Sequence, residues 1–261
     1  MTHRLVLAAA AAAPALLFCA ASPAMAASQT PWEGWYIGGN LGGVWGDASA
    51  QLGAAVGPGG GNNVVINPLD VTAINNSTLS GSGDTSGFTG GIEGGYNWVS
   101  NGWMLGIESD WGWMDISQDA SRSATSPLLV NPPITYSLSQ SVKTDWIWTL
   151  RPRFGFVGAN WLVYGTVGLA VTELKNSLHF SDNIAAPHVV SQDTSDTKTG
   201  WIGGVGAAYA FSPEWSAKGE WLYTDFGTVN NTVVGSNGFV VLDSHASVRG
   251  NIFRVGVDYR F

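Results

Sequence analysis

The sequence predicts an all-β fold, an eight-stranded antiparallel transmembrane β-barrel with four long extracellular loops and short periplasmic turns. Three observations predict it. Charged residues form only 11% of the 261 residues, whereas a soluble domain carries roughly 25%. Eight segments alternate between apolar and polar side chains, and the connections between these segments alternate between short and long.

The start of the chain has the features of a secretory signal peptide. A basic beginning is followed by an apolar stretch from Leu5 to Ala21 and by small residues that form a cleavage site. We expect cleavage between Ala26 and Ala27, which removes residues 1–26 and leaves residues 27–261 as one barrel domain. A transmembrane helix is the weaker alternative, because the stretch is shorter than the roughly 20 residues that a helix needs to span a bilayer.

Eight later segments have strand character, because their apolar and polar side chains alternate with a period of two. Most are as long as the about 9 to 11 residues that a tilted strand needs to cross a membrane, or slightly longer. The segments run from Trp35 to Trp45, Gly87 to Trp98, Trp103 to Asp115, Val142 to Phe156, Trp161 to Thr172, Gly200 to Phe211, Trp215 to Phe226, and Gly250 to Phe261.

The connections predict how these strands are oriented. Three are tight turns, and four are long and polar. The long connections are residues 46–86, 116–141, 173–199 and 227–249. Barrels of the bacterial outer membrane have an even number of strands, short periplasmic turns and longer extracellular loops. We therefore expect both ends of the chain on the periplasmic side.

The distribution of charges along the strands separates a membrane barrel from a soluble β-sandwich. In the fourth segment Trp148 and Leu150 share one face, while Arg151 and Arg153 occupy the other. A soluble core could hold such charges only if they were paired. A barrel explains both faces, because its outer surface meets lipid and its lumen takes the charges.

Twelve charged residues are expected to point into the lumen, six acidic and six basic. They are Glu93, Glu108, Asp110, Asp145, Glu220 and Asp258 against Lys143, Arg151, Arg153, Lys218, Arg254 and Arg260. Side chains just fill the interior of an eight-stranded barrel. We predict a cross-strand ion-pair network that closes the lumen, since an ion-selective pore is more naturally lined by one sign of charge.

Several segments resemble a known family, the small outer-membrane β-barrel proteins of Gram-negative bacteria that include immunogenic, surface-antigen and porin-family proteins. The segments that carry this resemblance are Gly34 to Asn40, Gly87 to Gly91, Gly95 to Trp98, Leu150 to Gly155, Lys218 to Gly227 and Arg254 to Phe261. The resemblance implies a location in the outer membrane, contact with its lipids, and recognition of Phe261 by the outer-membrane insertion machinery. Pro152 departs from the family pattern, and we expect a β-bulge or a strained register there.

The composition and motifs favour a structural or surface-interaction role without catalysis. A net charge of −8 with no cluster of Lys and Arg excludes nucleic acid as a partner, and no spacing typical of a metal or cofactor site occurs. A narrow pore for small solutes is the alternative. A lipid-modifying enzyme is a further one, because His245 lies beside Asp243, Ser244 and Ser247 in a predicted loop. The partner of the loops and the oligomeric state stay open.

Overall fold

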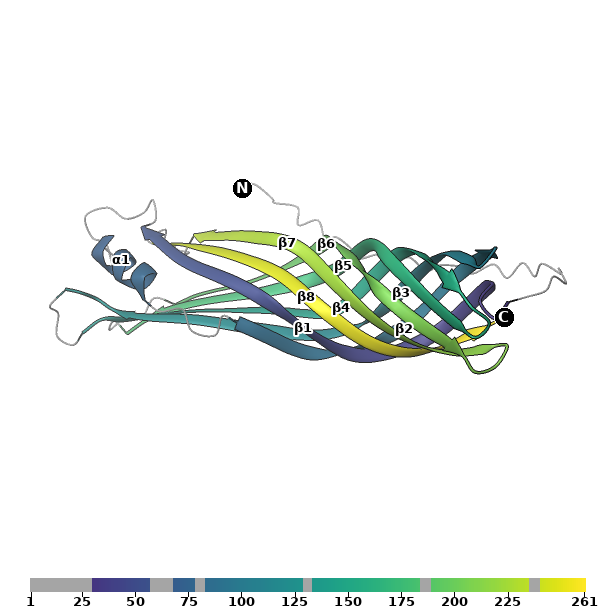
Figure 1. Ribbon diagram of the computed structural model, residues 1–261. Coiled ribbons are helices and arrows are strands. Elements are labelled where there is room, and N and C mark those ends of the chain that lie inside the picture. The colour runs from purple at the N-terminus through teal and green to yellow at the C-terminus, as the bar shows by residue number, and fades with distance from the viewer. Residues whose placement is uncertain (1–29, 57–67, 78–82, 129–132, 184–188, 235–239) are drawn as a thin grey trace, which may run out of the picture.

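The computed structural model describes residues 30–56, 68–77, 83–128, 133–183, 189–234 and 240–261. The expected cleavage site at Ala26 and Ala27 lies outside these residues. Eight antiparallel strands close into a ring in chain order, so the predicted fold class is confirmed (Figure 1). The strands are β1 (Gly34–Val56), β2 (Gly83–Ser100), β3 (Trp103–Thr125), β4 (Thr135–Val157), β5 (Trp161–Asp182), β6 (Val189–Ala210), β7 (Trp215–Val234) and β8 (Val240–Arg260).

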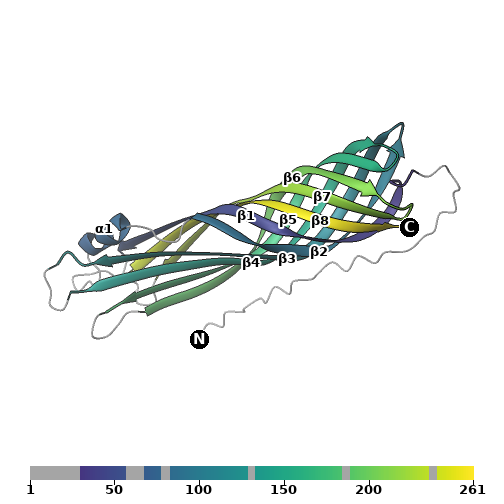
Figure 2. The same cartoon turned by 60° about the horizontal axis from the view of Figure 1, so that its bottom comes forward.

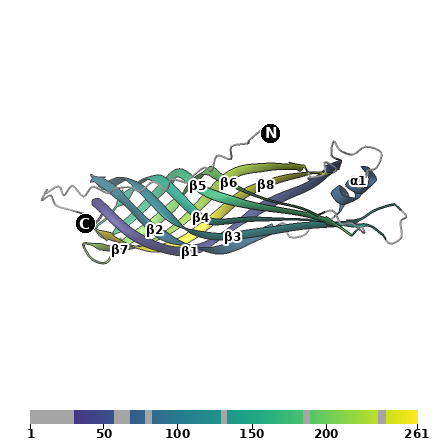
Figure 3. The same ribbon diagram turned by 180° about the vertical axis from the view of Figure 1, so that it is seen from behind.

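One short helix, α1 (Pro68–Asn76), lies at the end of the barrel opposite the C-terminus (Figures 1 and 3). In the described part of the chain, no helix combines the length and apolar character needed to cross a membrane.

The tight turns lie where the sequence predicts them. Between β2 and β3, Asn101 and Gly102 both adopt positive φ, 52° and 80°. Two consecutive residues of this kind form the type I′ turn, whose twist matches that of the flanking strands. Asn and Gly tolerate this conformation best, so the Asn-Gly pair explains why the hairpin closes here.

The strands are longer than predicted at their other ends. The fourth strand was expected to begin at Val142 and begins at Thr135, and β6 begins at Val189 instead of Gly200. The added residues are rich in Ser, Thr, Asn and Asp, so their apolar alternation is weak; the exceptions are inward-facing residues of β4 and β5 such as Tyr136, Leu138 and Phe180. Above the membrane the outer face of a strand need not be apolar, and backbone pairing continues with little of that pattern. Much of the predicted loops is therefore strand, and we call these added parts the extracellular extension.

The outer surface of the barrel is apolar. Leu41, Phe88 and Trp113 are each at least 71% exposed. Aromatic rings pack against one another beside the tight turns: the centroids of Trp103 and Phe156 lie 4.0 Å apart, and those of Trp215 and Tyr259 lie 5.0 Å apart. Such rings favour the interface between membrane and water, so the surface matches a lipid environment.

In the described strands, three β-bulges interrupt the pairing. The register shifts between Trp113 and Ile116 in β3, between Lys143 and Ile147 in β4, and between Asp225 and Thr228 in β7. A bulge adds a residue to one strand and reverses which side chains face inward beyond it. The period-two pattern that holds in the lower part of β4 therefore does not extend to its upper part.

The β-bulge expected at Pro152 does not form. The register on either side of it is the same, from Leu150↔Leu169 to Arg153↔Thr166, so there is no bulge. The two intervening pairs between β4 and β5 are missing, because proline has no N–H to donate. The Thr166 hydroxyl instead donates to the Pro152 carbonyl at 2.9 Å.

Candidate functional site

The structure brings nine of the twelve predicted inward charges together inside the barrel. They come from β2, β3, β4, β7 and β8, and each is at most 7% exposed. We call this set the charged layer; it comprises Glu93, Glu108, Asp110, Arg151, Arg153, Lys218, Glu220, Arg254 and Asp258. Because carboxylates and cations alternate within it, each buried charge has an opposite charge within 4.0 Å.

Glu108 is the centre of the charged layer. Its Oε2 accepts hydrogen bonds from Arg153 Nη1 at 2.7 Å, from Lys218 Nζ at 2.9 Å and from the Tyr36 hydroxyl at 2.7 Å. Its Oε1 accepts a further bond from Arg151 Nη2. A fully buried carboxylate is costly unless it is paired and hydrogen-bonded, and here both oxygens are satisfied by charged donors.

Arg254 joins two other carboxylates. Its Nε donates to Glu220 Oε2 at 2.7 Å, and its Nη2 donates to Asp110 Oδ2 at 3.1 Å. The same Asp110 oxygen accepts from Arg151 Nη2 at 2.9 Å and from the Thr149 hydroxyl at 2.5 Å. The guanidinium fork of arginine suits this bridging, because it offers several donors in a fixed plane.

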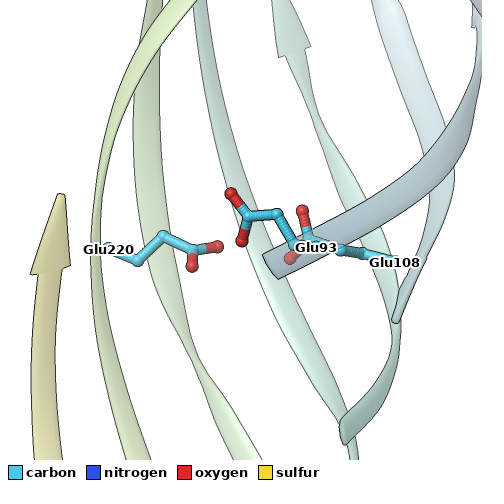
Figure 4. A group of neighbouring side chains, drawn as sticks. All are labelled: Glu93, Glu108 and Glu220. Carbon is cyan, nitrogen blue, oxygen red and sulfur yellow. The ribbon is translucent and has the colours of Figure 1, made fainter. Parts of the chain in front are cut away.

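Three carboxylates converge near the middle of the lumen. Oxygens of Glu93, Glu108 and Glu220 lie within 4.8 Å of one another (Figure 4). Carboxylate oxygens at such distances are typical ligands of a hard divalent cation. In this barrel Lys218 lies among them, with its Nζ 2.8 Å from Glu93 and 2.9 Å from Glu108. The chain therefore supplies from its own side chains the positive charge that a metal ion would bring.

Three predicted residues are not part of the charged layer. Lys143 and Asp145 are exposed, because the β-bulge in β4 reverses the facing of the strand between them and Arg151. Asp145 forms an ion pair on the outside with Lys175. Arg260 lies at the periplasmic rim, where it donates to the backbone carbonyls of Glu33 and Thr30 at 2.9 and 3.2 Å.

The expected balance of six acidic and six basic residues is therefore replaced by five acidic and four basic residues in the charged layer.

Sequence reasoning missed the uncharged members of the site. Asn40 donates to Glu93 at 2.9 Å, and the Tyr164 hydroxyl donates to Glu220 at 2.7 Å. The guanidinium of Arg153 lies 3.9 Å from the ring centroid of Tyr164, a cation–π contact. Tyr36 and Asn40 alternate with outward apolar residues, so the same parity that located the charges could have located them.

Apolar side chains fill the lumen on both sides of the charged layer. On the periplasmic side lies a cluster of Trp32, Met104, Leu162, Tyr164, Ala208 and Ala210. On the extracellular side lies a cluster of Val44, Met114, Ile116, Ile147, Ala170, Leu174, Ile202, Leu222, Phe226 and Ile252. The charged layer is thus enclosed by apolar packing, which lowers the local dielectric and strengthens its ion pairs.

The loop histidines provide no assembled catalytic group in the described residues. His179 is exposed on β5, and its Nδ1 lies 2.8 Å from the Ser191 hydroxyl. His188 and the side chains of Asp243, Ser244, His245 and Ser247 lie outside the described residues.

Comparison with known proteins identifies the family. The family model for the outer membrane protein beta-barrel domain matches residues 10–261. The chain belongs to this family. It is therefore a β-barrel of the outer membrane of a Gram-negative bacterium, in contact with the lipids of that membrane.

Two proteins of known name are similar to this chain in sequence. The chain is 33% identical over 232 residues to the 31 kDa outer-membrane immunogenic protein of Brucella melitensis biotype 1, a match that covers 88% of this chain and 84% of the relative. It is 27% identical over 183 residues to the 22 kDa outer membrane protein of Rhizobium leguminosarum bv. viciae, covering 68% of each. The resemblance inferred from the sequence is confirmed.

The fold is also similar to a solved barrel. The outer membrane protein OprG from Pseudomonas aeruginosa superimposes with a TM-score of 0.51 over 89% of this chain and 99% of that one. The two sequences are 13% identical, so the likeness concerns the fold alone.

Proposed function

We propose that this protein is a closed, non-catalytic barrel that contributes to the structure of the bacterial envelope and presents its extracellular extension to partners. One observation supports the proposal that the lumen is closed. The charged layer links opposite walls of the barrel through buried ion pairs, and apolar clusters enclose it on both sides. A pore would need a continuous polar path lined by hydrated groups. Apolar packing above and below the charges opposes such a path.

The test is single-channel conductance of the refolded mature chain in a planar bilayer. Folding is checked first by comparing the migration of boiled and unboiled protein in a detergent gel. We expect no discrete conductance steps from the folded barrel. Reproducible steps would support the alternative of a narrow pore for small solutes, and would show that the charged layer opens in the membrane.

We further propose that residues 1–26 are a signal peptide and that Phe261 takes part in recognition by the insertion machinery. Phe261 directly follows β8, is 77% exposed, and its N–H donates to the Trp35 carbonyl at 3.0 Å. Sequencing the N-terminus of the protein from outer membranes should give Ala27. Deleting Phe261 should lower the amount of assembled barrel in cells while refolding in detergent is retained.

A further inference from the structure

The barrel wall has a gap in its extracellular extension. Pairing between β6 and β7 ends at Trp201↔Asp225. Both strands continue beyond this point, β6 to Val189 and β7 to Val234, but each pairs only with its other neighbour among the described residues. The strands also spread apart toward the end of the barrel that carries α1 (Figure 2). An edge of β6 is therefore left without a partner strand.

A second gap in the wall, between the upper parts of β1 and β3, is covered by the helix α1. The gap beside β6 has no such cover among the described residues. Pairing between β2 and β3 ends at Thr89↔Met114, and β2 itself begins at Gly83, opposite Ala48, so β2 does not lie between β1 and β3 beyond that point. The helix α1 packs there, against both β1 and β3. Asp70 accepts a hydrogen bond from Ser126 at 2.6 Å, and Arg122 donates to the Asn75 carbonyl at 2.6 Å.

The hydrogen bonds of β6 show which residues face the gap. At the periplasmic end, the Ala210 N–H donates to Asn160 beside β5, and the Phe211 N–H donates to Trp215 of β7. In an antiparallel strand the N–H and C=O groups of successive residues point to opposite sides. Even-numbered residues therefore face β5, and odd-numbered residues face the side of β7.

This alternation extends to the upper end of the strand. The register between β5 and β6 runs without a shift from Trp161↔Tyr209 to Ser181↔Val189. The N–H and C=O groups that point into the gap therefore belong to the odd-numbered residues of the upper strand. These residues are Val189, Ser191, Asp193, Ser195, Thr197 and Thr199, all exposed. We call this row the β6 edge.

Among the described residues, the β6 edge has little of the usual protection against pairing with other chains. Natural edge strands are blocked by proline, by bulges, by charges that point inward, or by covering segments. Residues 189–199 contain no proline and no bulge. Inward-facing charges are limited to Asp196 and Lys198, which are even-numbered and lie 3.9 Å from each other. The edge is thus open to an added strand.

We propose that the β6 edge binds an extended, basic segment of a partner protein as an additional β-strand. Main-chain hydrogen bonds would supply affinity, as in other cases of strand addition. The charge favours a basic segment: Asp193 lies on the edge, and Glu173 of β5 lies on the same outer face, where it accepts a hydrogen bond from Ser195. The cation of that face, Lys175, is already paired with Asp145. Opposite charges on neighbouring strands stabilise a sheet.

A second copy of this chain fits the β6 edge less well. Two copies in one membrane have the same orientation, so their β6 strands would run parallel. Under two-fold symmetry Asp193 would then lie near Asp193 of the other copy, and like charges on facing strands are unfavourable. The proposed partner therefore carries Lys or Arg where this chain carries Asp.

The experiment uses the refolded mature chain in detergent micelles and a fluorescent ten-residue peptide of alternating Thr and Lys. Binding is followed by fluorescence anisotropy, and amide hydrogen exchange locates the site. We expect the peptide to slow exchange at residues 191–199 by about tenfold or more at saturation. The control peptide has the same sequence with an N-methyl group on every residue, which keeps its charge but removes the N–H donors of both edges. It should not bind.

A pair of variants tests the backbone of the edge itself. Thr197→Pro removes an N–H that points into the gap, whereas Thr197→Ala keeps it. We expect Thr197→Pro to weaken binding about tenfold, as expected for lost main-chain pairing, and Thr197→Ala to leave binding unchanged. Equal binding of the two peptides, or binding without protection of residues 191–199, would overturn the proposal, as would absence of binding at millimolar peptide. If exchange at residues 191–199 slows with rising protein concentration in the absence of peptide, a second copy of the chain occupies the β6 edge, and the proposal of a basic partner is wrong.

This inference rests on the surface-interaction role proposed above, and the two can fail separately. A conducting barrel that binds the peptide would contradict the closed lumen and leave the docking edge standing. A barrel that shows no conductance steps and does not bind the peptide would contradict the docking proposal alone.

Discussion

Lys218 of β7 donates to Glu108 of β3 at 2.9 Å, although these strands lie four places apart in a ring of eight. Strands so separated stand on opposite walls of the barrel, so this bond crosses the lumen. Arg254 of β8 reaches Asp110 of β3, three places away around the ring, at 3.1 Å. Direct bonds therefore cross the lumen between its walls, in addition to the backbone ladder around the ring.

The first prediction concerns Arg254. Replacing Arg254 by Met keeps the length and packing of the side chain but leaves Asp110 and Glu220 without one of their cations. Breaking a buried ion pair from one side typically costs about 3–5 kcal/mol, and we expect a loss of that order in the free energy of unfolding. Urea titration of the refolded barrel, followed by tryptophan fluorescence, measures it.

A matched control lies on the same strand. Arg249 pairs with Asp225 at 3.1 Å, but its side chain is 59% exposed. Exposed pairs contribute roughly 0–1 kcal/mol, so Arg249→Met should change the urea midpoint little. If the two variants were equally stable, the charged layer would not hold the barrel together.

The second prediction concerns the outer face. Val167 of β5 points outward and is 58% exposed, midway between the periplasmic turn and the bulges. A lysine on the lipid face near the bilayer centre costs about 2–4 kcal/mol, so Val167→Lys should lower the folded fraction in lipid vesicles. Thr199→Lys, in the extracellular extension, should have little effect. Equal folding of both variants would mean that Val167 does not face lipid.

Much of the fold could be predicted because a barrel wall follows one simple rule. Side chains alternate between lipid and lumen, so the period-two pattern locates the strands and assigns residues such as Arg151 and Glu108 to the inside. The same rule failed for Lys143 and Asp145, because a bulge leaves no mark in the pattern of apolar and polar residues. A bulge is a feature of pairing between strands and cannot be recognised in one strand alone.

The extracellular extension could not be predicted for a different reason. In residues 189–199 both faces of β6 meet water, so selection for apolar alternation is absent and the segment resembles a loop. Its strand structure comes from pairing with β5. This partner lies elsewhere in the sequence, so it cannot be recognised from the residues of the segment alone. The unpaired edge of β6 likewise becomes visible only when the pairing on its two sides is compared.

The third prediction concerns the gap in pairing at Pro152. The Thr166 hydroxyl donates to the Pro152 carbonyl, and Thr166 is buried. Thr166→Val keeps the shape and removes the donor, which leaves a carbonyl unpaired at a cost of about 1–3 kcal/mol. The urea midpoint should fall accordingly. Thr166→Ser, which keeps the hydroxyl, should retain most of the stability, and a midpoint lowered as far by Ser as by Val would show that the methyl group matters instead.

The fourth prediction concerns the pH dependence of α1. Tyr136 is buried in the apolar cluster beneath α1, together with Ile74, Leu138 and Phe180. Burial raises the pKa of Tyr136, and the negative charges of Asp70 and Asp182 raise it further. In the undocked state its pKa should be near the ordinary value of about 10. The docked state therefore holds the proton more tightly, so docking is fully favourable below pH 10 and weakens as the pH rises above it.

This weakening can be measured at one labelled position. The single cysteine of the chain is Cys19 in the expected signal peptide, so Leu69→Cys places one fluorophore on the exposed face of α1 in the mature chain. We expect its anisotropy to fall as the pH rises above about 10, the pKa of a free tyrosine. In Tyr136→Phe, which has no ionisable group at this position, the fall should be absent. An equal fall in anisotropy in both proteins would assign the pH dependence to a group other than Tyr136, because Tyr136→Phe has no phenol to ionise.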